Sequence, residues 1–425
     1  MPKGYARYAL AVMVGINFLN YMDRYVPTAV SPTIQKEFHL DDFQVGILAS
    51  AFLIVYAVCA LPFGYWADRA VRKTVIGVGV TIWSLATLLT GLSQNFTHLF
   101  LSRAVVGVGE ASYYPAGTSL LGDYYPKHTR GRAMSIWGAG TAFGIAVGFV
   151  GGGLIAEHFG WRTAFFVTAI PGLIFGVLAF TLREPLRGSA EAAGPRVEHV
   201  AASGLGSFIG LFRIRTLALT IAAQVFLFFV LAADVSWLPI YMVRHFHLTV
   251  SGASTLSGAV VVAGGLVGTL GGGWIADRRT RKDPKGNLEV SLVGFAVGAV
   301  TVGIAILAPT QALFVPFFFV SVIALYLYSG PFTAISQNVV PPSLRASATT
   351  LTLFTAHLLG DSWSPAAVGW LSEHLHSLQT ALLVTSTPLL LIAAAITYAA
   401  FKSVARDTAA MEETWAAGKV EALPA

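Results

Sequence analysis

Twelve long apolar stretches constrain what this chain can fold into more than any other feature of its sequence. A helix needs about 20 mostly apolar residues to cross the roughly 30 Å hydrocarbon core of a bilayer. The stretches meet that length, and they lack the alternation over about ten residues that membrane β-barrel strands show. The sequence therefore predicts an all-α integral membrane protein of twelve transmembrane helices, covering approximately residues 8–32, 43–67, 73–93, 97–122, 132–156, 163–182, 216–241, 252–276, 288–308, 312–338, 346–371 and 378–401.

The composition excludes a soluble protein with an ordinary surface. Only 11% of the residues are charged and 55% are hydrophobic, and the mean hydropathy is +0.68. A soluble domain carries about 25% charged residues, so this chain has too little charge to cover a water-exposed surface of its size. We expect a multi-pass protein of a cell membrane, either a plasma membrane or a bacterial inner membrane.

The distribution of Lys and Arg predicts how the helices are oriented. With the N-terminus in the cytoplasm, 22 of the 27 basic residues lie in inside segments and three lie outside. Cytoplasmic loops typically carry such an excess, so both termini are expected in the cytoplasm. The net charge of +6 would by itself suggest a nucleic-acid partner. Because the loop positions account for it, no nucleic-acid binding is expected.

Two markers recur in one register and predict an internal duplication. The run GYWADRAVRK at 64–73 returns as GGWIADRRTRK at 272–282, which places Asp277 209 residues after Asp68. Arg132 and Arg345, each followed by alanine, open the fifth and eleventh spans and lie 213 residues apart. A repeat of six spans is the parallel-repeat plan of many transporters. We therefore predict a first half at 1–182, a cytoplasmic linker at 183–215, a second half at 216–402 and a cytoplasmic tail at 403–425.

Ionisable residues at membrane depth are the strongest functional signal. Each costs at least about 2.5–3.5 kcal/mol at the centre of a span, so such residues are rarely idle. From a rise of about 1.5 Å per residue, Asp23 and Arg103 share a level and are expected to pair. Glu110 lies deeper, within reach of Arg24 if that side chain points inward. We predict that these four residues form one polar cluster lining a cavity in the first half.

A carboxyl group in this cluster meets two opposed influences. Loss of water strengthens its hold on a proton, and a neighbouring guanidinium weakens that hold. If the carboxyl changes its arginine partner as the helices move, its proton affinity switches, so Glu110 or Asp23 is the predicted proton carrier. A permanent structural ion pair is the alternative. Under the coupled interpretation, a proton gradient supplies the energy and no cofactor is needed.

The second half holds a smaller polar signal. His357 and Asp361 lie four residues apart in the eleventh span and therefore share one helix face. Because histidine titrates near neutral pH, we predict a substrate or proton-coupling role for this pair. A hydrogen bond to a neighbouring helix is the alternative. Asp234, near the outer end of the seventh span, is expected to contact a gate or a loop.

The run at 64–73 resembles the signature loop of the major facilitator superfamily, which latches the cytoplasmic side shut in the outward-open state. The resemblance implies a cytoplasmic gate made of Gly64, Asp68, Arg69, Arg72, Arg132, Asp277, Arg278 and Arg345. We expect Gly64 to permit close helix packing. Asp68 is expected to meet the N-terminus of a neighbouring helix, a contact that typically contributes about 0.3–1 kcal/mol. Positive-inside topology explains the arginines but not Asp68.

Glycines at 140, 144, 148 and 152 share one face of the fifth span. Such a face lets a partner helix approach very closely. Tight static packing and a sliding contact between the two halves are both compatible with this pattern.

Three runs resemble the Spinster branch of the superfamily, whose animal members move sphingosine-1-phosphate and lysophospholipids. They are NYMDRY at 20–25, FGYWADR at 63–69 and SRAVVGVGEASY at 102–113. The resemblance is clear over residues 15–185 and weaker afterwards, and the compact, loop-poor chain is typical of a bacterial member. It implies that Asp23, Arg24, Arg103 and Glu110 are the substrate and proton-coupling residues of the first half.

Several substrates suit these residues, because an arginine pair recognises either a phosphate or a carboxylate. The leading interpretation is a monomeric, proton-coupled carrier of a lysolipid-like amphiphile that works by alternating access between the halves. A proton symporter of small organic anions is the rival, because the Asn-Tyr-x-Asp-Arg pattern is also similar to that of sugar-acid symporters; a multidrug antiporter is third. An enzyme is not expected, because the sequence has no metal-ligand cluster, nucleophile elbow or phosphate loop.

Overall fold

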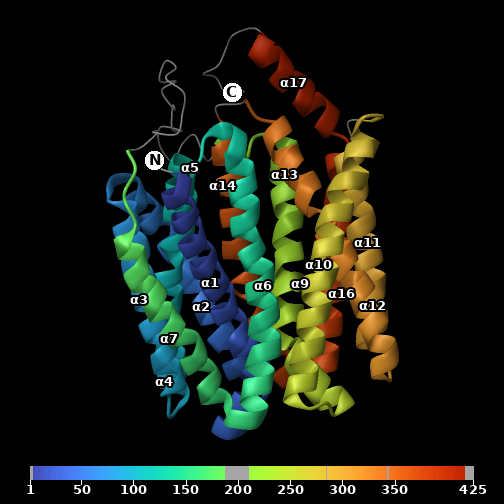
Figure 1. Cartoon of the computed structure of the whole chain (residues 1–425). Coiled ribbons are helices and arrows are strands. Elements are labelled where there is room, and N and C mark those ends of the chain that lie inside the picture. Colours follow the sequence, from blue (N-terminus) through green and yellow to red (C-terminus); the bar gives the residue numbers. More distant parts are fainter. Residues whose placement is uncertain (1–2, 187–209, 284, 342–343, 417–425) are drawn as a thin grey trace. The chain divides into compact units, whose positions relative to one another are not determined.

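The computed structural model describes residues 3–186, 210–283, 285–341 and 344–416, which form helices and short connections without a β-strand. This confirms the predicted all-α class. Figure 1 labels the helices along the chain. The part before the gap at 187–209 contains α1 (Lys3–Phe38), α2 (Asp42–Arg69), α3 (Arg72–Gly91), α4 (Phe96–Ala111), α5 (Tyr113–Tyr124), α6 (Lys127–Phe159) and α7 (Trp161–Thr181).

The part after that gap begins with α9 (Arg215–Phe246) and α10 (Val250–Thr280). It continues with α11 (Gly286–Ile306), α12 (Gln311–Tyr326), α13 (Ser329–Asn338), α14 (Arg345–Ala356), a short π-helix η2 (His357–Asp361), α15 (Ser364–Leu375), α16 (Leu378–Ala400) and α17 (Val404–Ala416). The predicted linker therefore falls largely outside the described residues, as does the end of the predicted tail from 417 onward.

Nine helical segments of the described chain are long and apolar enough to cross a membrane. The predicted spans at 8–32, 97–122 and 346–371 also fall on helices, but these do not meet that criterion. Two of them are broken into shorter pieces, and α1 carries Asp23 and Arg24 in its apolar stretch. A membrane protein is thus supported, while the count of twelve spans and the cytoplasmic location of both ends stay predictions.

Three of the helix breaks are each followed by a proline. A proline clashes with the carbonyl four residues before it and donates no hydrogen bond to that carbonyl. Pro115 follows the end of α4 at Ala111 by four residues, and Pro331 lies four residues after Leu327, the residue that caps the C-terminus of α12. Pro365 likewise lies four residues after Asp361, the last residue of η2.

The described chain divides into two compact units. Unit 1 contains residues 1–196 together with Val235–Val262 and Pro365–Glu373. Unit 2 contains Val197–Asp234, Ala263–Ser364 and His374–Ala425. Helix α9 therefore contributes its first part to unit 2 and its last part to unit 1, with the boundary after Asp234. The duplication into halves at 1–182 and 216–402 stays a prediction.

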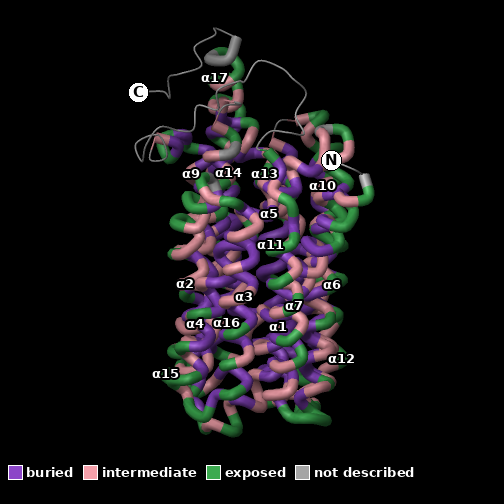
Figure 2. The backbone as a smooth tube through the Cα atoms, turned by 60° about the vertical axis from the view of Figure 1, so that its left-hand side comes forward, coloured by how far each residue is buried: buried purple, intermediate pink, exposed green. Residues whose placement is uncertain are grey.

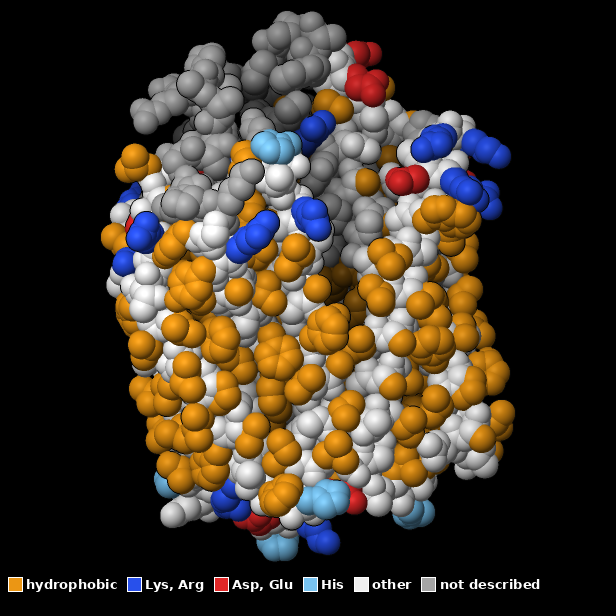
Figure 3. All heavy atoms as spheres, viewed as in Figure 1, with side chains coloured by type: hydrophobic (Ala, Val, Ile, Leu, Met, Phe, Trp, Pro, Cys, Tyr) orange, Lys and Arg blue, Asp and Glu red, His pale blue; other side chains and the backbone are white. Residues whose placement is uncertain are grey.

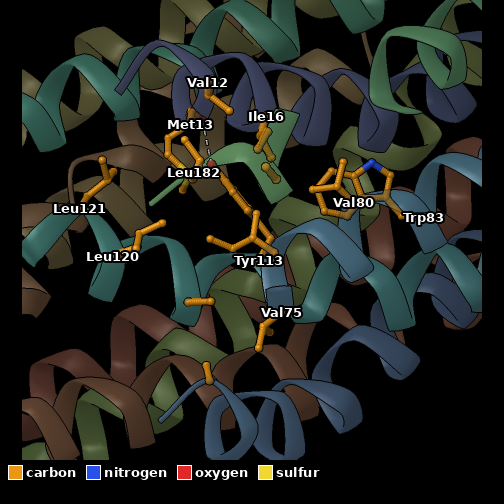
Figure 4. Close-up of a cluster of buried hydrophobic side chains, with 14 of the residues drawn as sticks. Val12, Met13, Ile16, Val75, Val80, Trp83, Tyr113, Leu120, Leu121 and Leu182 are labelled. Carbon is orange, nitrogen blue, oxygen red and sulfur yellow. Dashed lines mark hydrogen bonds between the residues drawn. The ribbon is translucent and has the colours of Figure 1, made fainter. Parts of the chain in front are cut away.

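A buried cluster of apolar side chains joins α1, α3 and α5 in unit 1, as Figure 4 shows, and Trp137 of α6 belongs to the same cluster. The hydroxyl of Tyr113 donates to the Met13 carbonyl at 2.8 Å and accepts from Trp137 Nε1 at 2.6 Å. Lipid tails are as apolar as these side chains, so the hydrophobic effect does little to hold helices together within a membrane. The close packing and this chain of hydrogen bonds instead fix α1 against α5 and α6.

The predicted glycine face of α6 packs directly on α1. An ideal Cβ added at Gly144 would lie 2.4 Å from the Phe18 carbonyl oxygen, and one at Gly148 would lie 2.9 Å from that of Met22. Gly140 and Gly152 face the same helix, near Val14 and Ala29. Close packing within unit 1 is therefore confirmed. It sets the position of the α1 segment that carries Asp23 and Arg24.

Outward-facing apolar side chains cover the helices. On α7, Val167, Ile170, Ile174 and Val177 recur at helical spacing and are each at least 43% exposed. Figure 2 marks such exposed positions along the backbone, and Figure 3 shows hydrophobic side chains covering most of one face between regions where charged residues gather. This pattern is typical of a lipid-facing surface.

Candidate functional site

The four charged residues predicted to form a cluster come together inside unit 1. Arg24 of α1 donates from Nε to Oε2 of Glu110 on α4 at 2.6 Å. The Glu110 side chain is fully buried, and the Arg24 side chain is 21% exposed. The Arg24 side chain therefore points inward, as the predicted contact with Glu110 requires. Seven residues before Glu110, α4 also carries the buried Arg103.

Asp23 does not form the expected direct ion pair with Arg103. Its Oδ2 instead accepts a hydrogen bond from the Thr87 hydroxyl of α3. Arg103 still acts on Asp23 electrostatically, from beyond ion-pair distance. Thr87 was missed because a threonine in an apolar span gives no sequence signal that it serves a carboxylate on another helix.

Aromatic rings of α1 and α2 surround the two guanidinium groups. The Arg24 guanidinium lies 4.5 Å from the ring centre of Tyr56, 5.2 Å from that of Tyr21 and 5.4 Å from that of Phe52. The Arg103 guanidinium lies 5.0 Å from the same Phe52 ring. Cation–π attraction is worth about 2 kcal/mol or more when the groups are desolvated. The shared Phe52 ring thus helps to hold two like charges close together.

Several polar atoms of this cluster have no hydrogen-bond partner among the described residues. They are Asp23 Oδ1, Arg103 Nη1, Glu110 Oε1 and Asn20 Nδ2. An unmade hydrogen bond of a buried group costs about 1–3 kcal/mol, and more for charged groups. Native proteins rarely keep such groups without a reason. The donors on Arg103 and Asn20 and the acceptors on the two carboxyls can therefore take an anion and a proton.

The second predicted pair also meets, inside unit 2. Nδ1 of His357 lies 2.5 Å from Oδ2 of Asp361. The pair spans η2, a π-helical turn in which the Ser362 amide also donates to the His357 carbonyl at 3.1 Å. Phe228 of α9 packs edge-on against the His357 ring at 5.1 Å. π-Helical turns are frequent at functional sites, and the sequence did not predict this one.

Arg72, predicted as a gate residue, lies in a buried network at one end of unit 1. Its guanidinium contacts Asp123 at 2.5 Å and Glu184 at 2.7 Å, and it also donates to the carbonyls of Ser119 and Pro185. Arg72 itself is 0% exposed. It thus joins α3, α5 and the segment after α7, so its surroundings are those of a structural residue.

The other predicted gate residues lie at helix ends or on the surface. A Cβ added at Gly64 would meet nothing within 4 Å, so the close packing expected there is absent. The same holds at Gly273, the equivalent position 209 residues later. The side chain of Asp68 lies outside the described residues. Arg69 lies 3.5 Å from the ring centre of Tyr65, and Arg278 lies 3.7 Å from that of Trp274. Both arginines are exposed, as are Arg132, Asp277 and Arg345. Their gate roles stay predictions.

Sequence reasoning missed a polar network around Asp42 in unit 1. Arg244 of α9 donates from Nη1 to Asp42 Oδ2 at 2.9 Å and from Nη2 to Oδ1 at 2.5 Å. Gln35 of α1 and Ser372 of α15 also donate to the Asp42 carboxylate, at 2.8 and 2.6 Å. Four helices therefore converge on one carboxylate. No sequence signal links residues 202 positions apart.

The backbones of α2 and α15 also touch beside this network. An ideal Cβ at Gly369 would lie 2.3 Å from the Asp42 carbonyl oxygen, and one at Gly46 would lie 2.3 Å from that of Pro365. The Ala366 amide donates to the Ser50 hydroxyl at 3.1 Å. Small residues and backbone polar groups thus bring the two helices into direct contact.

Glu37, in the last turn of α1, forms an ion pair with Arg162 on the surface of unit 1. Glu37 accepts from Trp161 Nε1 at 2.7 Å and from Arg162 Nη1 at 2.6 Å. Burial raises the pKa of this carboxyl, but the two hydrogen bonds and the arginine charge outweigh burial, and the pKa lies below its usual value. Glu37 is therefore ionised at neutral pH and holds α1 to the start of α7.

Comparison with known proteins identifies the family. Residues 13–365 match the family model described as Major Facilitator Superfamily. Sphingosine-1-phosphate transporter SPNS2 of Mus musculus is 31% identical over 378 residues, which cover 84% of this chain and 68% of that protein. Protein spinster homolog 1 of Xenopus tropicalis is 29% identical, covering 86% and 72% of the two chains.

A solved structure carries the same similarity over nearly the whole chain. It is the crystal structure of a bacterial homologue of the human lysosomal transporter Spinster, in an inward-facing and unoccupied conformation. Its TM-score is 0.87 at 25% identity, and the match covers 96% of this chain and 99% of that one. These relatives are transporters, not enzymes. The chain therefore belongs to the major facilitator superfamily and, within it, to the Spinster-like transporters.

Proposed function

We propose that this protein is a proton-coupled carrier that moves a lysolipid-like amphiphile with a phosphate headgroup across a cell membrane. In this proposal twelve helices cross the bilayer, both termini are cytoplasmic, and two six-helix halves alternate access to a central site. The transporter class rests on the family. The coupling rests on the charge cluster of unit 1, and the substrate class rests on that cluster together with the names of the relatives.

One observation carries the proposal: the ion pair of Arg24 with the fully buried Glu110, beside an Arg103 donor that no described residue pairs with. While Glu110 is ionised, it neutralises Arg24. When a proton binds Glu110, that neutralisation ends, and the two guanidiniums around Phe52 present an uncompensated positive charge. An anionic group is then favoured at the cluster, because an unpaired buried charge is costly.

This linkage makes the proton and the anion bind together. A proton on Glu110 raises the affinity of the cluster for an anion, and a bound anion raises the affinity of Glu110 for the proton by the same factor. Asp23 sits next to the same arginines and is the second candidate proton acceptor. If the carrier changes orientation only when the proton and the anion are both bound, or both absent, then proton movement and anion movement are coupled.

The proposed substrate class follows from the charge cluster and the names of the relatives. Two guanidiniums that can each donate several hydrogen bonds suit a phosphate group. SPNS2 of Mus musculus is named a sphingosine-1-phosphate transporter, and the matching Arabidopsis thaliana protein is named a probable sphingolipid transporter. Both names favour an amphiphile over a small organic anion such as a sugar acid, and over a multidrug substrate.

A transport screen in proteoliposomes tests this proposal. The purified protein is reconstituted, a pH gradient is imposed, and uptake of sphingosine-1-phosphate, a lysophospholipid and a sugar acid is measured side by side. We expect gradient-driven movement of one or both amphiphiles and none of the sugar acid. Gradient-driven sugar-acid uptake without lipid transport would replace the lipid proposal by the organic-anion alternative.

Arg24→Lys provides a matched control for the chemistry. It keeps the positive charge but loses the planar guanidinium that contacts Glu110 and the three aromatic rings. If the geometry of the pair matters, this variant loses most coupled transport although the charge is unchanged. Full activity in Arg24→Lys would show that only the positive charge at this position matters, not the geometry of the guanidinium.

A further inference from the structure

The hydroxyl of Thr87 in α3 is bonded to a carboxylate of another helix. Thr81 and Thr90, on the same helix, donate from their hydroxyls to the backbone carbonyls four residues earlier, at 2.8 and 2.9 Å. A buried threonine inside a helix often satisfies its hydroxyl in this way. Thr87 donates instead to Oδ2 of Asp23 on α1. The side chain of Thr87 therefore determines where the Asp23 carboxylate lies.

Contacts between α3 and α4 fix the position of Thr87. One turn before it, the backbone nitrogen of Trp83 would lie 2.6 Å from an ideal Cβ added at Gly109 of α4, so the two backbones touch. Nearly one turn after it, Thr90 donates to the Ser102 hydroxyl of α4 at 2.9 Å. Helix α3 is thus held against α4 on both sides of Thr87, and the Thr87 hydroxyl is presented from a fixed place.

Asp23 and Arg103 are a buried carboxyl group and a buried guanidinium that stay apart. They attract each other electrostatically, yet Asp23 Oδ1 and Arg103 Nη1 each lack a hydrogen-bond partner among the described residues. Because unpaired buried charges are costly, two such groups are expected to pair. Each is held by a different helix: Asp23 by Thr87 on α3, and Arg103 at 5.0 Å from the Phe52 ring centre on α2.

This separation leaves Arg103 able to take an anion. If Asp23 paired with Arg103, the carboxylate would neutralise the guanidinium and occupy its donors, as Glu110 does for Arg24. In the observed arrangement Arg103 instead keeps its charge and the donor Nη1. A guanidinium of this kind suits a phosphate group. The availability of Arg103 therefore depends on a group that holds Asp23 elsewhere.

We propose that Thr87 is a positioning residue of the anion site: by holding the Asp23 carboxylate on α3, it prevents an ion pair of Asp23 with Arg103 and keeps Arg103 free for the substrate headgroup. The inference rests on the proposed function and deepens it, because it names the residue that decides whether this guanidinium can bind the headgroup. Thr87 acts through Asp23 and does not touch the substrate itself. All three residues belong to unit 1.

Competition binding to the purified protein at one pH tests this role, with a phosphate-bearing lysolipid and a neutral analogue of the same acyl chain. Thr87→Val keeps the shape of the side chain but removes the hydroxyl, so Asp23 should turn to Arg103. We expect the affinity for the phosphate-bearing lysolipid to fall about tenfold, the effect of losing one charge-assisted hydrogen bond. The affinity for the neutral analogue should stay nearly unchanged. Thr87→Ser, which keeps the hydroxyl, should retain most of the affinity for both ligands. No loss in Thr87→Val, or an equal loss for the two ligands, overturns the proposal.

A second substitution separates the release of Asp23 from damage to the fold. In the double variant Thr87→Val with Asp23→Asn, the amide cannot form an ion pair with Arg103, so the affinity for the phosphate-bearing lysolipid should rise again above that of Thr87→Val. The readout is binding, because Asp23 is itself a candidate proton acceptor for transport. A double variant that binds as weakly as Thr87→Val would show that Asp23 does not capture Arg103, and the proposal would be wrong.

Arg103→Ala in the same assay tells two kinds of failure apart. If Arg103→Ala leaves the affinity for the phosphate-bearing lysolipid unchanged, the headgroup role in the proposed function fails, and the role of Thr87 fails with it. If Arg103→Ala weakens that affinity while Thr87→Val does not, the proposed function stands and only the positioning role of Thr87 is contradicted.

Discussion

Arg244 and Asp42 lie 202 positions apart in the chain and form a two-pronged ion pair, with 2.9 Å between Nη1 and Oδ2 and 2.5 Å between Nη2 and Oδ1. The pair joins α9 to α2, and Gln35 and Ser372 add α1 and α15 to the same carboxylate. Together with the backbone contact of α2 and α15, it makes one end of unit 1 a tightly closed assembly. On the predicted topology, this end faces away from the cytoplasm.

The first prediction concerns this ion pair. Arg244→Gln and Asp42→Asn should each lower the free energy of unfolding by about 1 kcal/mol, since the Arg244 side chain is 41% exposed and water screens the pair. The double variant should cost little more than either single one, because both remove the same interaction. Unfolding in detergent measures this, with the exposed Arg278→Gln as control. Additive losses would mean that the two side chains do not act on each other.

The second prediction uses the glycine face of α6. Gly144→Ala places a methyl group 2.4 Å from the Phe18 oxygen, whereas Gly138→Ala meets nothing within 4 Å. Overpacking of this kind costs about 1–3 kcal/mol. The apparent unfolding temperature should therefore fall for Gly144→Ala and stay unchanged for Gly138→Ala. Equal behaviour of the two variants would show that α1 and α6 do not pack at this face.

The third prediction separates Arg72 from its neighbour Arg69. Arg72→Gln removes the partner of two carboxylates in a buried network and should destabilise the protein by about 3–5 kcal/mol. Arg69→Gln changes an exposed side chain that lies on the Tyr65 ring, and its effect on stability should be within about 0.5 kcal/mol. The yield of folded protein and the unfolding temperature measure the stability of each variant. A stable Arg72→Gln with altered transport would return Arg72 to the predicted gate role.

The fourth prediction concerns substrate charge. Arg103→Ala should weaken binding of a phosphate-bearing lysolipid about 10- to 100-fold, the loss expected for a charge-assisted hydrogen bond worth about 1.5–3 kcal/mol. A neutral analogue with the same acyl chain should bind nearly as before. Competition binding measures the affinities of the phosphate-bearing lysolipid and of the neutral analogue in the unmodified protein and in the variant. An equal loss for the two would indicate that Arg103 supports the fold of the site, not headgroup recognition.

How far the sequence predicts this molecule depends on the range of the interaction. The helices, the pair Arg24–Glu110 and the pair His357–Asp361 follow from local rules: apolar length, the cost of buried charge and the helical repeat. The glycine face of α6 follows in the same way. These rules act within one helix, or between helices whose depths can be estimated.

Other parts of the site depend on contacts that no local rule specifies. Thr87 serves Asp23 from α3, and Phe52 lies between two arginines, yet a threonine and a phenylalanine are ordinary in a span. The π-helical turn at His357 contains Gly360, which packs closely against α9, and the spacing of residues does not indicate such a turn. Arg72 has the sequence context of a gate but the surroundings of a buried structural residue.

The central claim is that Glu110 links proton binding to anion transport, and Glu110→Gln tests it most directly. The amide keeps the size and a hydrogen-bond acceptor for Arg24 but can neither ionise nor take up a proton. In proteoliposomes loaded with lysolipid, we expect this variant to exchange substrate across the membrane, independently of pH, and to lose accumulation driven by a pH gradient. Gradient-driven accumulation equal to that of the unmodified protein, with the same pH dependence, would contradict the account.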